Sequence, residues 1–174
     1  NTSTGGMGGF GTNFPARNGG TGGNGNGGAI YNDSAGTLTL TNCTFGGNTG
    51  TGGGGGNGGS RAGGNGGIGR GAVFNRGAMT ITACTVSGNS GTGGAGGTGT
   101  PGGAAGSGTG GLTNVNSATI SNTLSAGNTG SAGPDSSGAF SSNGYNLIGD
   151  GTGSSGWVSS GAVTAKPRSS SCVV

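Results

Sequence analysis

The chain has 174 residues, of which 53 are Gly, six are Lys or Arg, three are Asp and none is His, so its net charge is only +3. Apolar residues make up 26% of the chain, too few for a globule with one large hydrophobic core, because burial of apolar surface must offset the entropy lost on folding. The lack of His excludes a Ser/His/Asp or Cys/His triad in its usual form, and the scattered basic residues form no patch for nucleic acid.

A glycine-rich phrase opens the chain and returns twice in the same phase. The copies occupy 1–11, 48–58 and 89–99, and each begins with Asn. With these Asn residues as phase marks and Asn128 as the fourth, the repeats are 47, 41 and 39 residues long. A fixed phase predicts stacked copies of one structural unit. A disordered chain, the alternative that the composition allows, has no reason to keep it.

Two further phrases follow each glycine-rich one and predict strands. The first reads Gly-Ala-Ile-Tyr-Asn at 28–32 and Gly-Ala-Val-Phe-Asn at 71–75, with a looser copy at 111–116. The second alternates, as in Thr-Leu-Thr-Leu-Thr at 37–41, and recurs in both later repeats. Period-two alternation with β-branched residues favours strands, and after a bend a third short strand is expected at Cys43–Phe45 and Cys84–Val86.

Short strands separated by Gly or Asn corners indicate an all-β fold, a short parallel β-helix or β-solenoid of about three coils. Each coil would stack on the next through parallel strands about 4.8 Å apart, so equivalent side chains would form ladders. The expected ladders are Leu40–Ile81–Ile120 inside the coils and Asn48–Asn89–Asn128 at a corner. We expect one domain over 1–157 and a C-terminal tail at 158–174 that caps the last coil or reaches a neighbour.

The run Gly-Gly-Ala-Ile-Tyr-Asn, followed by Thr-Leu-Thr-Leu-Thr-Asn-Cys-Thr-Phe-Gly-Gly-Asn-Thr, resembles the coils of right-handed parallel β-helix proteins on bacterial surfaces, including polymorphic outer-membrane-protein-like repeats. The segment 133–150 is similar to the one that closes such domains in large secreted choice-of-anchor proteins. The resemblance covers roughly 28–48, 71–89 and 111–157, and it implies a β-helix at the cell surface. The glycine-rich tracts depart from this family, because they are much longer than the corner loops that such coils need.

The glycine-rich tracts occupy 1–27, 49–70 and 90–110 and hold Gly at every third position over much of their length. A period of three matches an extended left-handed helix with three residues per turn, and four Pro are too few for collagen. Each tract breaks near its middle. We therefore expect three hairpins of extended limbs, packed as a polyglycine-II-type helix layer beside the coils. Three flexible loops are the alternative.

The acidic residues form no catalytic or metal-binding motif in the sequence. Asp33, Asp135 and Asp150 lie in different repeats and in turn-like contexts, where Asp is a common structural choice. Glycosidase chemistry, by contrast, needs two positioned carboxylates. We expect no enzyme activity, no metal and no cofactor.

The cysteines occupy two kinds of position. Cys43 and Cys84 share one repeat position, which places their Cα atoms about 5 Å apart on adjacent coils. They are candidates for a disulfide, and two small thiols in a ladder are the alternative. Cys172, near the end of the chain, is an odd cysteine that would be available to pair between molecules.

The outward side of the alternating phrase predicts a grid of hydroxyl groups. Its rows are Thr39–Thr80–Thr119 and Thr41–Thr82–Ser121. Such a grid resembles the ice-binding face of β-solenoid antifreeze proteins, and polyglycine-II bundles occur in another antifreeze family. The alternative is ordinary β-propensity on a solvated face.

These patterns predict an extracellular structural protein, a surface or filament subunit whose copies associate through the ends of the coil stack, where strand edges are open. The scarcity of charge and the abundance of Gly, Ser, Thr and Asn suit an extracellular chain. Ice binding through the threonine grid is one alternative. A cell-surface adhesin is another, with Tyr31, Phe74, Tyr145 and Trp157 as candidate aromatic contacts. We expect no nucleic acid, no membrane span and no small-molecule ligand.

Overall fold

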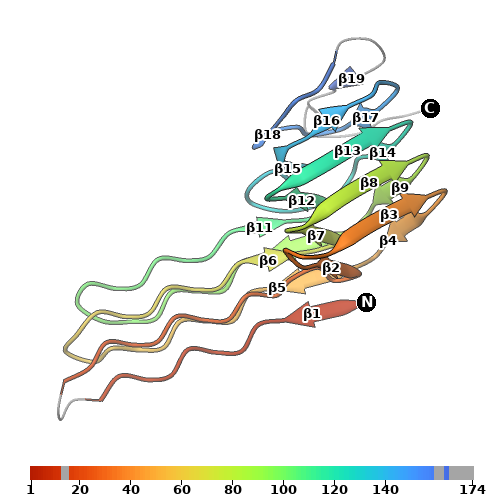
Figure 1. Ribbon diagram of the computed structural model, residues 1–174. Helices are drawn as coiled ribbons and strands as arrows, with labels where there is room; N and C mark the ends of the chain where they lie inside the picture. The colour runs from red at the N-terminus through yellow and green to blue at the C-terminus, as the bar shows by residue number, and fades with distance from the viewer. Residues whose placement is uncertain (13–15, 159–162, 165–174) are drawn as a thin grey trace.

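The computed structural model describes residues 1–12, 16–158 and 163–164 of the chain. These residues form β-strands without any helix, and every pair of neighbouring strands is parallel. The strands lie in stacked sheets, the arrangement expected of a parallel β-solenoid, and three glycine-rich hairpins extend from one side of the stack (Figure 1). The predicted all-β, parallel architecture is therefore confirmed.

Three sheets make up the strand stack. The first contains β2 (Ile30–Asn32), β7 (Val73–Asn75), β12 (Leu112–Asn114), β15 (Ser136–Ala139) and β18 (Ser154–Ser155). The second contains β3 (Thr37–Thr41), β8 (Ala78–Thr82), β13 (Ser117–Ser121) and β16 (Ser141–Ser142). The third contains β4 (Thr44–Gly46), β9 (Thr85–Ser87), β14 (Leu124–Ser125), β17 (Leu147–Ile148) and β19 (Val163–Thr164).

Two smaller sheets lie where the hairpins leave and rejoin the stack. One contains β1 (Thr2–Thr4), β5 (Thr49–Thr51) and β10 (Ser90–Thr92), and the other pairs β6 (Gly69–Arg70) with β11 (Gly108–Thr109). In these sheets, as in the strand stack, equivalent residues of successive repeats pair with one another: Thr2 pairs with Thr49, and Thr49 pairs with Ser90.

The hydrophobic core is a narrow column of side chains between the three larger sheets. Leu40, Ile81 and Ile120 pair in register on β3, β8 and β13, and all three are buried. Val73 and Leu112 on the first sheet, and Phe45 and Val86 on the third, complete the column. Alternation sends every second residue of these strands inward. The chain therefore forms a core from few apolar residues.

Each repeat turns a corner through left-handed backbone. Asn42, Ala83 and Asn122 have φ of 54°, 53° and 49° between the second and third strands. Asn adopts this conformation more readily than other residues with a side chain, and Ala does so less readily. The bend expected before Cys43 is therefore a left-handed corner that recurs in each repeat.

The hairpins consist of extended limbs that hydrogen-bond to one another at every third residue. We call 2–11, 49–58 and 90–99 the outbound limbs and 18–25, 62–69 and 101–108 the return limbs. Outbound limbs are joined by Gly5 N to Thr51 O, Gly8 N to Gly54 O and Gly11 N to Asn57 O, at 2.7–2.8 Å. Return limbs are joined by Gly19 N to Ala62 O, Gly22 N to Asn65 O and Gly25 N to Ile68 O, at 2.8–2.9 Å. Outbound and return limbs are joined by Gly20 N to Gly9 O and Gly56 N to Gly20 O, both at 2.8 Å.

Close approach of the limbs explains the glycine at their contact positions. A Cβ atom on Gly53 or Gly56 would overlap the carbonyl oxygen of Gly6 or Gly9 on the preceding limb. Outward positions carry other residues, such as Asn57 and Thr98. The sequence period of three is thus the period of backbone contacts between limbs.

Only part of the predicted tail lies within the described residues. β19 pairs with β17 through Leu147 and Val163, which adds a strand to the third sheet. Residues 159–162 and 165–174, with Cys172 among them, lie outside the described residues.

Candidate functional site

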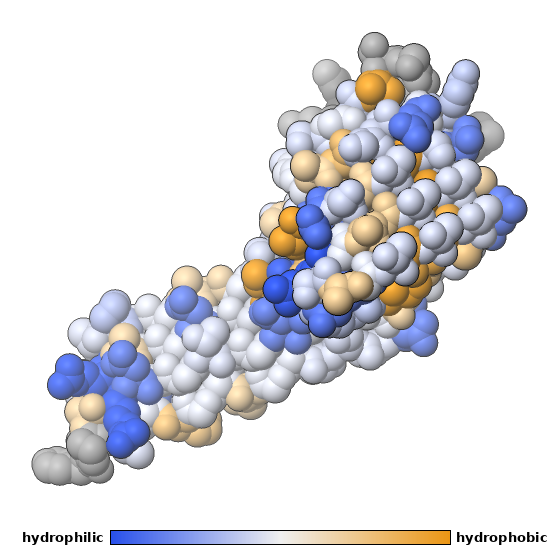
Figure 2. Space-filling model, in the orientation of Figure 1, coloured by the Kyte–Doolittle hydropathy of each residue, from blue (hydrophilic) through white to orange (hydrophobic). Residues whose placement is uncertain are grey.

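The predicted threonine grid lies on the outer face of the second sheet. Thr39 pairs with Thr80, and Thr80 with Thr119, while Thr41, Thr82 and Ser121 form a second row in register. The grid residues of β3 are exposed, and Thr119 and Ser121 on β13 are half-buried. Figure 2 shows the face as rows of weakly polar side chains over the strand stack.

Geometry fixes the spacing of these hydroxyl groups. Neighbouring strands lie about 4.8 Å apart, and alternate residues along a strand about 6.7 Å apart. Thr82 Oγ1 and Ser121 Oγ are 3.3 Å apart, within hydrogen-bonding distance. Leu40, Ile81 and Ile120 anchor the strands from the buried side. The face is therefore a fixed array of neutral hydroxyl and methyl groups, which can order water but offers no catalytic acid or base.

The Asn residues of the corner ladder are buried and hydrogen-bond to one another. Asn48 donates its backbone N–H and its side-chain amide to Asn89 Oδ1, at 2.9 and 2.8 Å. Asn89 makes the same pair of bonds to Asn128 Oδ1, at 3.0 and 2.8 Å. Asn128 donates both groups to Asp135 Oδ1 at 2.8 Å. The ladder therefore joins successive coils, and its buried side chains are not accessible to a ligand.

A second amide ladder was missed from the sequence. Asn32 donates to Asn75 Oδ1 at 2.6 Å, and Asn75 donates to Asn114 Oδ1 at 2.7 Å. Each side chain also donates to a carbonyl oxygen of its own coil or the next one, such as Gly77 O and Ser117 O from Asn75. The signal was available, because Asn closes the first strand phrase in all three repeats.

The cysteine position is a third ladder of the same kind. Cys43 N donates to Cys84 Sγ at 3.4 Å, and Cys84 N donates to Thr123 Oγ1 at 3.3 Å. Both sulfur atoms are free thiols, Cys84 fully buried and Cys43 half-buried. Burial raises the pKa of the Cys84 thiol. The side chain at this position receives the N–H of the preceding coil, so a thiol and a hydroxyl are interchangeable there.

The structure brings two of the three acidic residues together, although they were expected in different repeats. Asp135 is buried and accepts the backbone N–H of Asp150 on its second carboxylate oxygen, so these two residues lie together. Asp33 is exposed on a turn, where the backbone N–H of Ser34, and next the Tyr31 hydroxyl, lower the pKa of its carboxyl. No cluster of His, Cys, Asp or Glu in the described residues could hold a metal ion.

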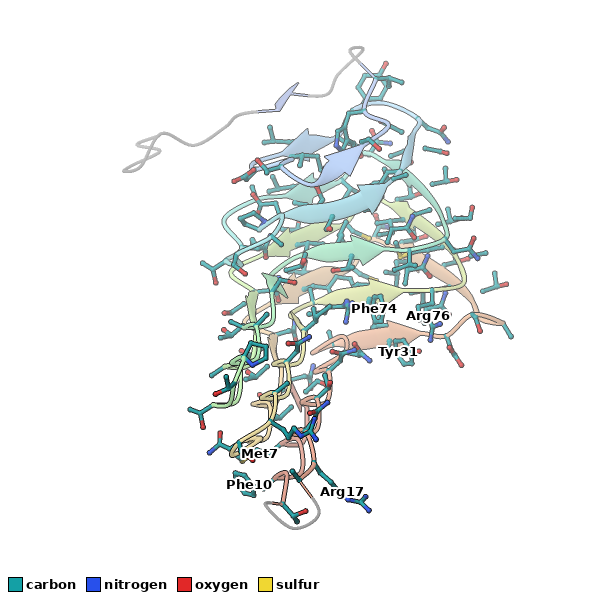
Figure 3. All side chains as sticks on the ribbon, turned by 90° about the vertical axis from the view of Figure 1, so that its left-hand side faces the viewer. Met7, Phe10, Arg17, Tyr31, Phe74 and Arg76 are labelled. Carbon is teal, nitrogen blue, oxygen red and sulfur yellow. The ribbon has the colours of Figure 1, made fainter. Side chains whose placement is uncertain are left out.

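An aromatic and basic cluster at the base of the hairpins was also missed from the sequence. Tyr31 stacks on Phe74 with ring centroids 5.4 Å apart, and the Arg70 guanidinium lies 4.0 Å from the centre of the Phe74 ring. Arg76 donates to the Tyr31 hydroxyl at 3.3 Å, and that hydroxyl donates to Asp33 at 3.0 Å. Figure 3 shows Tyr31, Phe74 and Arg76 side by side near the lower end of the strand stack.

The aromatic residues proposed for adhesion do not form one exposed surface, because Tyr31 and Phe74 stack on each other while Trp157 contacts Phe140 instead. Phe74 is buried beneath its neighbours, and Trp157 stacks on Phe140 with ring centroids 5.1 Å apart. Tyr31 and Tyr145 are exposed, at 43% and 76%, but belong to different parts of the stack. The cluster around Tyr31 satisfies its own polar groups, which is what a stabilising surface contact requires.

Comparison of the chain with protein-family models, with curated proteins and with solved structures found no match. Among the described residues, no helix has the length and apolar character needed to cross a membrane.

Proposed function

We propose that this chain is an extracellular structural protein whose copies associate with one another. In this proposal it is a short parallel β-helix of about three coils, joined to a polyglycine-II-type helix layer that stiffens it. The proposal rests on architecture, because the buried Asn side chains of the strand stack hydrogen-bond to one another and hold the coils together. Its sparse charge and its Gly, Ser, Thr and Asn content support an extracellular setting.

The observation that carries the proposal is the hydrogen bonding between limbs. Backbone bonds recur every three residues and link each limb to neighbours in two directions, as in Gly8 N to Gly54 O and Gly56 N to Gly20 O. Three residues per turn is the repeat of the left-handed extended helix. Limbs joined in this way resist bending, since each one is tied to its neighbours along its whole length. Such a layer has few side chains for chemistry and suits a load-bearing or spacing role.

Self-association is tested by sedimentation velocity and negative-stain microscopy over a range of protein concentrations. The proposal expects oligomers or filaments that grow with concentration. A monomer that persists to about 1 mM would leave a dissociation constant too weak for a structural assembly and would contradict the proposal.

Ice binding is the second candidate, and the register of the threonine grid favours it. Thr39, Thr80 and Thr119 lie opposite one another on three successive strands of one sheet. Their hydroxyl and methyl groups repeat at the strand spacing, so an ordered water layer can form over the face.

Thermal hysteresis at millimolar protein concentration tests this second function. Thr80→Tyr places a bulky ring in the centre of the grid and removes most of the hysteresis if the grid binds ice. Thr98→Tyr is the matched control, because Thr98 is an exposed residue of the third outbound limb. No hysteresis in the unaltered protein, or equal loss in both variants, excludes ice binding through this face.

A further inference from the structure

One corner of the strand stack carries a side-chain amide that the fold does not use. Asn42 lies between β3 and β4 with φ of 54°, and its backbone N–H donates to Thr82 O at 3.1 Å. The residue is exposed, and its side-chain amide makes no hydrogen bond within the described residues. The ladder Asn residues, by contrast, are buried and hydrogen-bonded. The Asn42 amide is therefore available for chemistry that the ladder amides are not.

The exposure of Asn42 is a property of the corner in every repeat. The equivalent residues, Ala83 and Asn122, are also exposed and have φ of 53° and 49°. Ala83 is exposed although β8 is paired on both sides, with β3 and with β13. Figure 1 shows the corner between β3 and β4 on the side of the stack opposite the hairpins. A side chain at this position therefore points away from the neighbouring coils.

The residues that follow Asn42 complete a recognition motif for glycan transfer. Asn42-Cys43-Thr44 has the form Asn-x-Ser/Thr, in which x is any residue but Pro, and we call this the acceptor tripeptide. The transferring enzyme needs the Asn amide and the hydroxyl group two residues later. Thr44 is exposed on β4, and its hydroxyl, like the Asn42 amide, has no partner in the described part of the chain. Both groups are thus free on the outside of one corner.

Two other acceptor tripeptides begin at Asn1 and Asn32, and the fold uses the amide of each. Asn1 Nδ2 donates to Asn48 Oδ1 at 3.1 Å. Asn32 is buried, and its Nδ2 donates to Asn75 Oδ1 at 2.6 Å and to Ala78 O at 3.0 Å. A glycan replaces one hydrogen of this nitrogen, so at Asn32 it would break the ladder. Transfer occurs on a chain that is still folding, and only a glycan that the fold tolerates remains on the folded protein.

Backbone conformation alone does not account for the tripeptide. Asn adopts left-handed backbone more readily than most residues, which makes it acceptable at this corner. The corner does not require Asn, however, because Ala83 takes nearly the same φ in the second repeat.

We propose that Asn42 is an attachment site for an N-linked glycan, added as the chain is exported. The inference rests on the extracellular setting of the proposed function. The donor is an oligosaccharide carried on a polyprenyl pyrophosphate. Its C1 forms a bond to Asn42 Nδ2, the bond from C1 to the pyrophosphate oxygen breaks, one Nδ2 proton is lost and polyprenyl pyrophosphate leaves.

A glycan at this corner restricts which surfaces of the protein meet a neighbour. N-linked glycans are bulky and hydrated. Asn42 directly follows Thr41, the last grid residue of β3, so a glycan would cover that end of the threonine grid. The hairpins lie on the other side of the stack and stay free (Figure 1). Copies of the modified protein would therefore associate through surfaces away from this corner.

Secretion of the full chain from eukaryotic cells, behind a cleavable signal peptide, tests the inference. The mass of the intact protein is measured before and after treatment with peptide-N-glycosidase, which removes the glycan and converts its Asn to Asp. Peptide mapping then locates the converted residue. The expected result is a glycan on Asn42, with Asn1 and Asn32 unmodified in the folded protein.

Matched variants separate the tripeptide from the structure of the corner. Asn42→Gln and Thr44→Ala abolish the glycan, and Thr44→Ala does so with the acceptor Asn42 in place. Thr44→Ser keeps the hydroxyl and retains the glycan. Ala83→Asn creates the same tripeptide at the next corner, since Cys84 and Thr85 follow it, and acquires a second glycan. Ala83→Gln is its control and acquires none.

The outcomes separate this inference from the proposed function, because self-association is measured on the same secreted protein by sedimentation velocity. Secreted protein with an unmodified Asn42 overturns the inference, whatever its state of association. A glycan on Asn32 in place of Asn42, or an Ala83→Asn variant without a second glycan, also overturns it. A protein that carries the glycan and stays monomeric at every concentration supports the site and overturns the proposed assembly.

Discussion

Replacing Gly56 by Ala tests whether backbone contact between limbs holds the hairpins together. The added Cβ would overlap Gly9 O, so the first outbound limb must retreat by more than about 1 Å to reach ordinary van der Waals contact. The control is Gly54→Ala on the same limb, where the nearest atom is 3.8 Å away.

The magnitude follows from the hydrogen bonds that such a retreat breaks. Three flank the site: Gly8 N to Gly54 O at 2.8 Å, Gly11 N to Asn57 O at 2.7 Å and Gly20 N to Gly9 O at 2.8 Å. At about 1 kcal/mol for each net bond, the free energy of opening the first hairpin falls by about 3 kcal/mol. This change corresponds to a roughly hundredfold loss of amide-exchange protection.

Amide exchange followed by NMR measures the effect at Gly8, Gly11 and Gly20 individually. Gly54→Ala leaves their protection unchanged or slightly higher, because Ala reduces the entropy of the unfolded chain. If Gly56→Ala exchanges like the unaltered protein, or if these amides are unprotected from the start, the hydrogen-bonded limbs do not exist in solution and the reasoning fails.

Three further predictions concern the strand stack. Asn89→Ala leaves the Asn48 N–H without its buried acceptor and lowers the free energy of unfolding by about 3 kcal/mol. The Tm followed by circular dichroism therefore falls by roughly 6–12 °C. Asn57→Ala is the control, because Asn57 accepts the Thr98 N–H at an exposed site, and it has little effect on the Tm. Ile81→Ala opens a cavity in the core column and costs about 2–5 kcal/mol in chemical denaturation; a smaller loss would mean that the column is loosely packed. Burial raises the pKa of Cys84 above the ordinary thiol value of 9.0, so the unfolded state loses its proton first and stability falls as the pH rises above that value. Cys84→Ala weakens this pH dependence in thermal melts at alkaline pH. An unchanged dependence would exclude a buried thiol.

The strand stack could be predicted because its pattern is local. Alternation in Thr-Leu-Thr-Leu-Thr marks the strand, and the offset from Leu40 to Ile81, which is the same for every residue of the strand, sets the register between these two coils. The same offset aligned Asn48 with Asn89, and hydrogen bonds join them. The repeat length and alignment are enough to predict a contact wherever a residue lies against the equivalent residue of the next repeat.

Contacts between residues at different repeat positions could not be predicted from the sequence. Asp135 ends the Asn ladder only because residues 133–135 bring it over Asn128, and its second oxygen reaches Asp150 N. Arg70 covers Phe74 because the second hairpin rejoins the stack beside it. Such contacts depend on where a hairpin or loop rejoins the strand stack, and the repeat length does not predict that position.

The way the limbs are joined has a consequence for temperature. Apolar surface exposed on unfolding raises the heat capacity, and exposed polar surface lowers it. The hydrogen-bonded limbs bury peptide groups and little hydrocarbon, so their opening has a small heat-capacity change. Hydrophobic cores weaken on cooling, and layers joined by backbone hydrogen bonds do not share this cause of weakening. The hairpins therefore keep their rigidity in the cold, where the core column beside them loses part of its driving force.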